Sequence, residues 1–155
     1  MVDTDAFATS PHLVDPARAL GLWFTDPPGM VVRFLRRTTF TVPLAQWLAG
    51  PGCDGLRERF PGEESFGFVL DLHLMDGRDP AVRAIVVEAA RPWASRARRA
   101  VVVPPEAAGR VYLASIRAAA SLARVVGLTV SVGDFREAVR DLRVAARSTR
   151  ASIVP

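Results

Sequence analysis

The segment 66–80 constrains the fold more than any other part of the chain. It reads FGFVLDLHLMDGRDP, an apolar run of strand length that ends in acidic residues and opens a helix at Asp79-Pro80. Nearly continuous apolar residues are typical of a strand that is covered on both faces, as in an α/β sheet. We therefore predict the central strand here. Binding sites gather outside the carboxyl ends of such strands, so we look for a site first at residues 75–79.

An antiparallel hairpin is predicted before this strand. Strands at 20–24 and 30–40 flank Asp26-Pro27-Pro28-Gly29, which is strong turn chemistry. In the second strand, Arg33 and Arg37 interrupt one face, so we expect that face to be partly exposed to solvent. Either an exposed Trp23 or this mixed face of the hairpin could support a homodimer.

The remaining elements follow from caps, prolines and periodicity. We predict helices from Thr41 to the break at Gly50-Pro51-Gly52, from the Asp79 cap to Ala90, from Pro104-Pro105 to a point before Gly127, and over 135–146 behind a capping box of Asp134 and Glu137, with strands at 100–103 and 128–132. The order β-β-α-β-α-β-α-β-α predicts an α/β fold. Its mixed sheet has an N-terminal antiparallel hairpin followed by alternating β-α units, with right-handed crossovers and parallel later strands.

The 155 residues suit one domain, which we place at 19–147, between a flexible tail at 1–18 and a second tail at 148–155. His12 falls in the first tail, where we expect it to be solvated. No uncharged stretch approaches the roughly 18 apolar residues of a membrane span. The first residues are acidic and the single Cys53 cannot form an internal disulfide. These features predict a cytoplasmic protein without a membrane span.

Several chemistries are excluded because the chain has no lysine. Its twenty basic residues are all arginine. A P-loop and a pyridoxal enzyme both need a lysine. The net charge of +4, with sixteen acidic residues interspersed, does not by itself favour nucleic acid. No serine has a discernible base, so we predict no catalytic residues, no enzyme activity and no cofactor.

A metal site near the central strand is chemically allowed. Asp71, His73, Asp76 and Asp79 lie close in sequence, and magnesium sites are often built from carboxylates at strand ends. We favour structural capping and a solvated loop over metal binding, and assign no metal site. For Cys53 we favour an unreactive surface or half-buried thiol, since no activating base is evident.

From about residue 20 to residue 146 the chain resembles a STAS domain, the fold of bacterial anti-sigma-factor antagonists. The resemblance rests on MVVRF at 30–34, LDLHLMDGRDPAVRAIVV at 70–87, AVVVPP at 100–105 and LTVSVGDFREAVRDL at 128–142. These motifs mainly record fold. The resemblance implies a non-enzymatic regulatory module that binds a signalling protein, such as a kinase-like or sigma-factor-regulating partner.

The resemblance also points to a site and to a departure from the family. STAS domains of this kind show a Leu-Asp-Leu strand and then an Asp-Ser pair whose serine is phosphorylated. Here Leu70-Asp71-Leu72 and Asp79 fall at that spacing, but Pro80 occupies the serine position. Because proline has no hydroxyl, this position cannot be phosphorylated. We predict that the surface at 76–83 binds the partner, through Arg78, Asp79, Pro80 and Arg83.

An alternative function uses arginines near the C-terminus. On the predicted last helix, Arg136, Arg140, Arg143 and Arg147 would form one stripe that could bind a polyanion or a small anionic ligand. Glu137 and Asp141 can pair with arginines within that helix, so a solvated, ion-paired face is the simpler interpretation.

Overall fold

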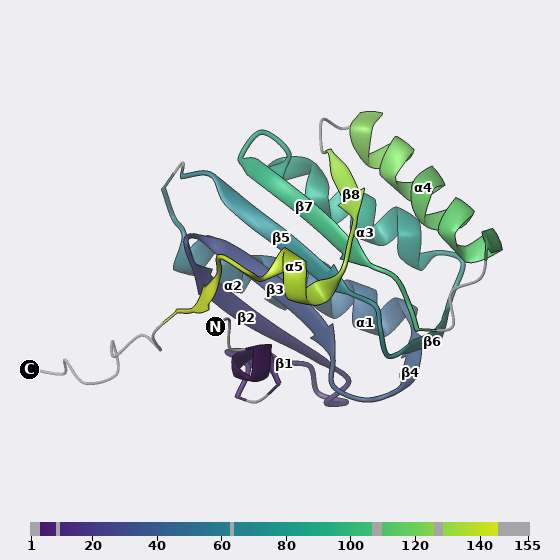
Figure 1. The fold of residues 1–155 in the computed structure, drawn as a ribbon, viewed down its shortest axis with the longest axis horizontal. Coiled ribbons are helices and arrows are strands. Elements are labelled where there is room, and N and C mark those ends of the chain that lie inside the picture. Colours follow the sequence, from purple (N-terminus) through teal and green to yellow (C-terminus); the bar gives the residue numbers. More distant parts are fainter. Residues whose placement is uncertain (1–3, 9, 63, 107–109, 126–128, 146–155) are drawn as a thin grey trace, which may run out of the picture.

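The main sheet has seven strands and extends through most of the molecule (Figure 1). The computed structural model describes residues 4–8, 10–62, 64–106, 110–125 and 129–145. The strands of the main sheet are β1 (Leu13–Val14), β2 (Leu20–Asp26), β3 (Gly29–Phe34), β5 (Phe66–Asp71), β7 (Ala97–Val103), β8 (Val130–Val132) and β9 (Arg143–Val144). Their order is β1-β2-β3-β5-β7-β8, and β9 also pairs with β2. A second, two-stranded parallel sheet joins β4 (Thr38–Phe40) and β6 (Met75–Arg78).

The topology is the predicted mixed α/β arrangement. β2 and β3 form an antiparallel hairpin, and β3, β5, β7 and β8 are parallel neighbours. The predicted central strand is confirmed, because β5 lies between β3 and β7. Its side chains alternate, with Phe68 and Leu70 packed toward one core cluster and Val69 buried in the other.

The long helices share one face of the sheet. They are α1 (Val42–Trp47), α2 (Cys53–Arg59), α3 (Val82–Ala90) and α4 (Arg110–Val125), and the short turns η2 (Leu48–Gly52) and η3 (Arg91–Trp93) continue α1 and α3. The turn η1 (Thr4–Phe7) and the one-turn helix α5 (Phe135–Ala138) pack on the opposite face. Each parallel connection moves one strand further in the same direction, so right-handed crossovers put their helices on one side. Figure 1 shows α1, α2 and α3 behind the sheet and α5 in front of it. Within the described residues, no helix has the length and apolar character needed to cross a membrane.

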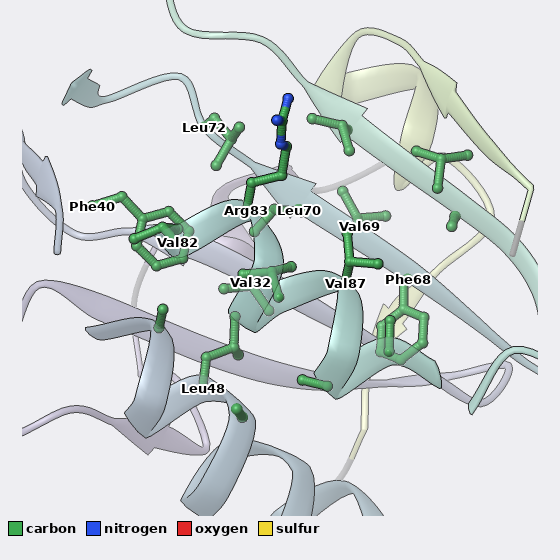
Figure 2. A pocket seen from close by; sticks show the side chains of 18 of the residues that line it. Val32, Phe40, Leu48, Phe68, Val69, Leu70, Leu72, Val82, Arg83 and Val87 are labelled. Atoms are coloured by element: carbon green, nitrogen blue, oxygen red, sulfur yellow. The ribbon is translucent and has the colours of Figure 1, made fainter. Parts of the chain in front are cut away.

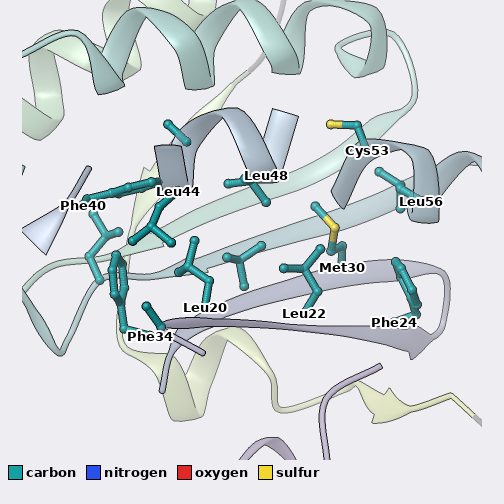
Figure 3. Packing of buried hydrophobic residues seen from close by; sticks show 14 of the residues in the cluster. Leu20, Leu22, Phe24, Met30, Phe34, Phe40, Leu44, Leu48, Cys53 and Leu56 are labelled. Atoms are coloured by element: carbon teal, nitrogen blue, oxygen red, sulfur yellow. The ribbon is translucent and has the colours of Figure 1, made fainter. Parts of the chain in front are cut away.

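The larger core lies between the sheet and these helices. Figure 3 shows apolar side chains of the hairpin packed against α1, η2 and α2. Leu20, Leu22 and Leu56 are fully buried there. Alternate residues of the two hairpin strands point to this face, as the period of two predicts: Leu20, Leu22 and Phe24 of β2 and Met30, Val32 and Phe34 of β3.

The opposite face of the sheet is also covered, which corrects one prediction. Trp23 is 1% exposed and Val31 is fully buried, and both pack with Phe7 and Val139 from the two ends of the chain. A surface through Trp23 and the second face of the hairpin is therefore not available for a homodimer. The prediction failed because it assumed that the charge of Arg33 requires exposure to solvent. In the structure this charge is paired with Asp71 within the fold.

The predicted flexible tail over residues 1–18 is wrong for the part that the structure describes. Leu13 and Val14 pair with β2, and Phe7 is 1% exposed. The buried Asp15 carboxylate accepts hydrogen bonds from the amides of Ala17, Ala19 and Leu20. Three such bonds compensate for the burial of the charge and fix the approach to β2.

His12 is held in the structure rather than solvated. Its Nδ1 accepts from the Phe24 amide at 3.1 Å, and its Nε2 lies 3.0 Å from the Ala145 carbonyl oxygen. The ring therefore connects the hairpin to the segment after β9. The expected C-terminal tail at 148–155 lies outside the described residues.

Several predicted boundaries differ from the structure, and two of these differences change how the elements connect. The helix after Thr41 does not stop at Gly50-Pro51-Gly52, because a π-turn carries Pro51 and continues directly into α2. A widened turn accommodates a residue that has no amide hydrogen to donate. The second hairpin strand ends at Phe34 instead of residue 40, and β4 then pairs with β6.

Candidate functional site

The predicted partner-binding residues lie at a corner where β6 leads into α3. The main-chain amide of Asp79 donates to the Phe40 carbonyl at 3.0 Å, which extends the pairing of β4 with β6. The Asp79 carboxylate accepts from the Val42 amide, also at 3.0 Å. Asp79 is thus bonded both to the end of β4 and to the start of α1. We call residues 78–83 the α3 corner.

The prediction that Asp79 caps its own helix is wrong. The residue at the N-cap position of α3 is Ala81, which offers no side-chain cap, and the Val82 amide bonds to the Asp79 carbonyl instead. The carboxylate caps α1, where Thr41 Oγ1 also accepts from the Leu44 amide. Free amides at a helix start attract a carboxylate, and the β4–β6 pairing brings α1 within its reach.

The four predicted residues differ in exposure. Pro80 and the adjacent Ala81 are exposed, whereas Arg78, Asp79 and Arg83 are half-buried. The exposed part of the corner is therefore small and apolar, with two arginines beside it.

Next to the corner lies a cluster of charged residues that the sequence did not predict. Arg37 forms ion pairs with Glu106 and Asp76, and His73 Nε2 is 3.9 Å from a Glu106 carboxylate oxygen. The bond to Glu106 raises the pKa of Arg37. These residues are about half exposed, which is typical of a solvated ion-pair network. Only the fold brings Arg37 and Glu106 together, since 69 positions separate them.

The four residues considered for a metal do not converge on one point. Asp71 is 3% exposed and its carboxylate binds Arg33 Nε at 2.9 Å and the His73 amide at 3.0 Å. The Asp79 carboxylate accepts from the Val42 amide of α1, and the Asp76 carboxylate is paired with Arg37. Within the described ranges, no group of three histidine, cysteine or acidic side chains is arranged to hold a metal ion.

Beneath the α3 corner lies an apolar cavity of about 200 Å³. Its walls come from α3 and the parallel strands, with further residues from η2 and α4. Figure 2 shows Val32, Phe68 and Leu70 of the sheet opposite Val82 and Val87 of α3. The two arginines of the corner, Arg78 and Arg83, also line it. The sequence signal for this cavity is the row of short side chains along α3, but whether they leave a space depends on how far the helix lies from the sheet.

Cys53 and Trp93 form part of the cavity wall. Burial raises the pKa of the Cys53 thiol, and the opposing effects of the Trp93 indole and the Arg57 charge are smaller. The Trp93 indole N–H is buried and has no hydrogen-bond partner within the described part of the chain. Its interaction with the Cys53 sulfur is therefore only a weak contact. The predicted surface or half-buried position of Cys53 is wrong, because the thiol is buried in the core; that it is unreactive stays a prediction, which burial and a raised pKa favour.

The predicted arginine stripe does not form. Helix α5 ends at Ala138, and the chain then turns and enters β9, which pairs with Thr25 and Asp26 of β2. Arg136 is therefore on a helix and Arg143 on a strand, with Arg140 in the turn between them. Arg147 lies outside the described residues. The Asp134 cap is confirmed, since its carboxylate accepts from the Glu137 amide.

The helix ends early because the following residues gain buried contacts and backbone pairing on the sheet. Ala138 and Val139 are buried against Trp23 and Val31, and the Ala145 amide donates to the Phe24 carbonyl. These tertiary contacts override a local helical pattern that has little stability alone.

Comparison with known proteins supports the fold but identifies no family. No protein-family model and no curated protein matches the chain. Among solved structures, the chain is similar to an uncharacterized protein of the DUF3478 family with a SpoIIAA-like fold from Shewanella loihica PV-4. The similarity has a TM-score of 0.53 and 12% sequence identity, and it covers 79% of this chain and 90% of the other. At this identity the similarity establishes a SpoIIAA-like, that is STAS-like, fold alone.

Proposed function

We propose that this protein is a non-enzymatic regulatory module that binds a signalling protein at the α3 corner. The observation that carries the proposal is the double attachment of Asp79, to β4 through its amide and to α1 through its carboxylate. A surface held from two sides loses little conformational entropy when a partner binds. The SpoIIAA-like fold supports the same class of function.

The chemistry of the corner favours an acidic partner surface. Arg78 and Arg83 flank the exposed Pro80 and Ala81, and arginine pairs with carboxylates through two parallel hydrogen bonds. The apolar Pro80 and Ala81 would form the centre of the contact and the arginines its rim. The resemblance to STAS domains suggests a kinase-like or sigma-factor-regulating protein as the partner. Since Pro80 cannot be phosphorylated, partner binding at this position would not be controlled in the way that the family resemblance implies.

Affinity capture with charge-reversal variants tests this proposal. The immobilised wild-type protein, the double variant Arg78→Glu/Arg83→Glu and a matched control Arg98→Glu/Arg99→Glu are each exposed to lysate of the source organism. The control reverses two exposed charges on β7, away from the corner. We expect one or more proteins to be retained by the wild type and the control and reduced at least tenfold on the corner variant. If every retained protein binds the corner variant as well as the control, the site assignment is wrong.

A further inference from the structure

We infer that the cavity beneath α3 binds a small apolar carboxylic acid, with its hydrocarbon part inside the cavity and its carboxylate on Arg83. This inference goes beyond the proposed partner binding and does not depend on it, because a small acid can be titrated into the isolated protein. It rests on the size of the cavity, its lining and the position of one guanidinium group.

The lining of the cavity suits a hydrocarbon group. The walls that face each other consist of aliphatic and aromatic side chains, including Val32, Phe68 and Leu70 from the sheet and Val86 and Val87 from α3. A cavity of this kind holds water poorly, because water needs two to four polar partners. An apolar cavity of about 150 Å³ accepts benzene, so the 200 Å³ found here fits a group of about eight carbon atoms.

The charged end of the cavity is defined by Arg83. Its side chain starts on the first turn of α3 and lines the cavity together with Leu72, which directly follows the carboxyl end of β5, and both side chains lie toward the same end of the lining in Figure 2. Val87 and Phe68 lie toward the other end of the lining in the same view. Ligands of open parallel sheets bind at this carboxyl edge. The cavity thus has one polar end and one apolar end.

The available hydrogen-bonding capacity of Arg83 favours an acid over a neutral molecule. Across the described residues, the Arg83 side chain makes no ion pair or hydrogen bond, although its exposure is only intermediate. A half-buried guanidinium has lost part of its hydration, and a carboxylate replaces it with charge-assisted hydrogen bonds. A cation or a strongly polar molecule would find no compensating group among the aliphatic residues of the wall.

Calorimetric titration of octanoate into the full chain tests the inference. Octanol serves as the neutral analogue and acetate as the head group without a tail. We expect saturable binding of octanoate, binding of octanol that is at least tenfold weaker, and no saturable binding of acetate. Arg83→Gln should weaken octanoate binding about ten- to hundredfold, the usual effect of one charged hydrogen bond, whereas Arg98→Gln should leave it unchanged.

Two cavity-filling variants test the location of the tail. Val87→Phe and Ala90→Leu each place larger side chains on the cavity wall, and each should reduce octanoate binding at least tenfold. Circular dichroism and thermal midpoints establish that the two variants fold. Two variants are used so that the test remains if one of them misfolds. If octanoate does not bind to the wild type, or binds equally to Arg83→Gln and to both filled variants, the inference is overturned.

The same variants separate this inference from the proposed partner binding. Val87→Phe and Ala90→Leu leave the exposed residues of the corner intact, so partner capture should be retained while octanoate binding is lost. Loss of capture by Arg78→Glu/Arg83→Glu in a protein that binds no octanoate would support the first proposal and reject the second.

Discussion

The carboxylate of Asp79 accepts a hydrogen bond from the main-chain amide of Val42, 37 positions earlier in the chain, at 3.0 Å. A residue at the start of one helix therefore caps another helix. The bond joins the two-stranded β4–β6 sheet to α1 and holds the α3 corner against the rest of the domain. Stability and the proposed binding surface consequently depend on the same side chain.

Substitution of Asp79 by alanine should destabilise the fold. Loss of a helix cap costs about 1 kcal/mol, within a range of about 0.5–2 kcal/mol. Urea denaturation of Asp79→Ala measures this loss, and Asp76→Ala is the matched control because its carboxylate is exposed and, among the described residues, makes only a long ion pair with Arg37. Asp79→Asn should keep most of the stability, since the amide oxygen can still accept. Equal stability of Asp79→Ala and Asp76→Ala would show that the cap contributes nothing.

Removal of Arg33 should be more costly than removal of any exposed arginine. Arg33 binds the buried Asp71, donates to the Phe7 carbonyl and lies 3.9 Å from the centre of the Phe135 ring. Arg33→Met leaves a buried carboxylate without its cation, and we expect a loss of about 3 kcal/mol in the free energy of unfolding. Arg37→Met, at a half-exposed ion pair, should change it little.

A double variant distinguishes the loss of the pair from the loss of packing. Arg33→Met combined with Asp71→Leu removes both charges, so it should recover at least half of the stability lost by Arg33→Met. A double variant that is less stable than Arg33→Met alone would contradict this interpretation.

Arginines 136, 140 and 143 should not act together on a polyanion. Because the helix ends at Ala138, these residues do not form a row of matched spacing. Replacing all three by glutamine should reduce the salt concentration of elution from heparin no more than replacing the exposed Arg98, Arg99 and Arg117, which removes the same charge. A clearly larger reduction for the first set would restore the polyanion-binding alternative.

The Cys53 thiol should make the fold less stable in alkaline solution. Burial raises its pKa, so the folded protein keeps the thiol proton at a pH where the unfolded chain loses it. The free energy of unfolding then falls as the pH rises above the ordinary thiol pKa of about 8.5, and this group contributes nothing below that range. Denaturation at pH 7 and pH 10 should show a larger decrease for the wild type than for Cys53→Ala. An equal decrease would mean that the thiol is not the group responsible.

The elements predicted from sequence are those whose signals are local. The apolar run at 66–71 predicts β5, the turn at 26–29 predicts the hairpin, and the caps Thr41 and Asp134 are confirmed by their hydrogen bonds to Leu44 and Glu137. Local patterns failed where distant residues compete. The segment after Val139 has a helical pattern, but its pairing with β2 provides backbone partners and buried contacts that an isolated helix lacks.

The sequence by itself determined the order of the hairpin, the later parallel strands and the helices between them, the mixed sheet and the absence of a hydroxyl at Pro80, because these follow from side-chain period, turn chemistry and residue identity. The tertiary structure decided which helix Asp79 caps, how the charge of Arg33 is neutralised and where an apolar cavity remains. Each of these depends on the distance between groups far apart in the chain. Such distances are set by the packing of helices on the sheet, which no local pattern specifies.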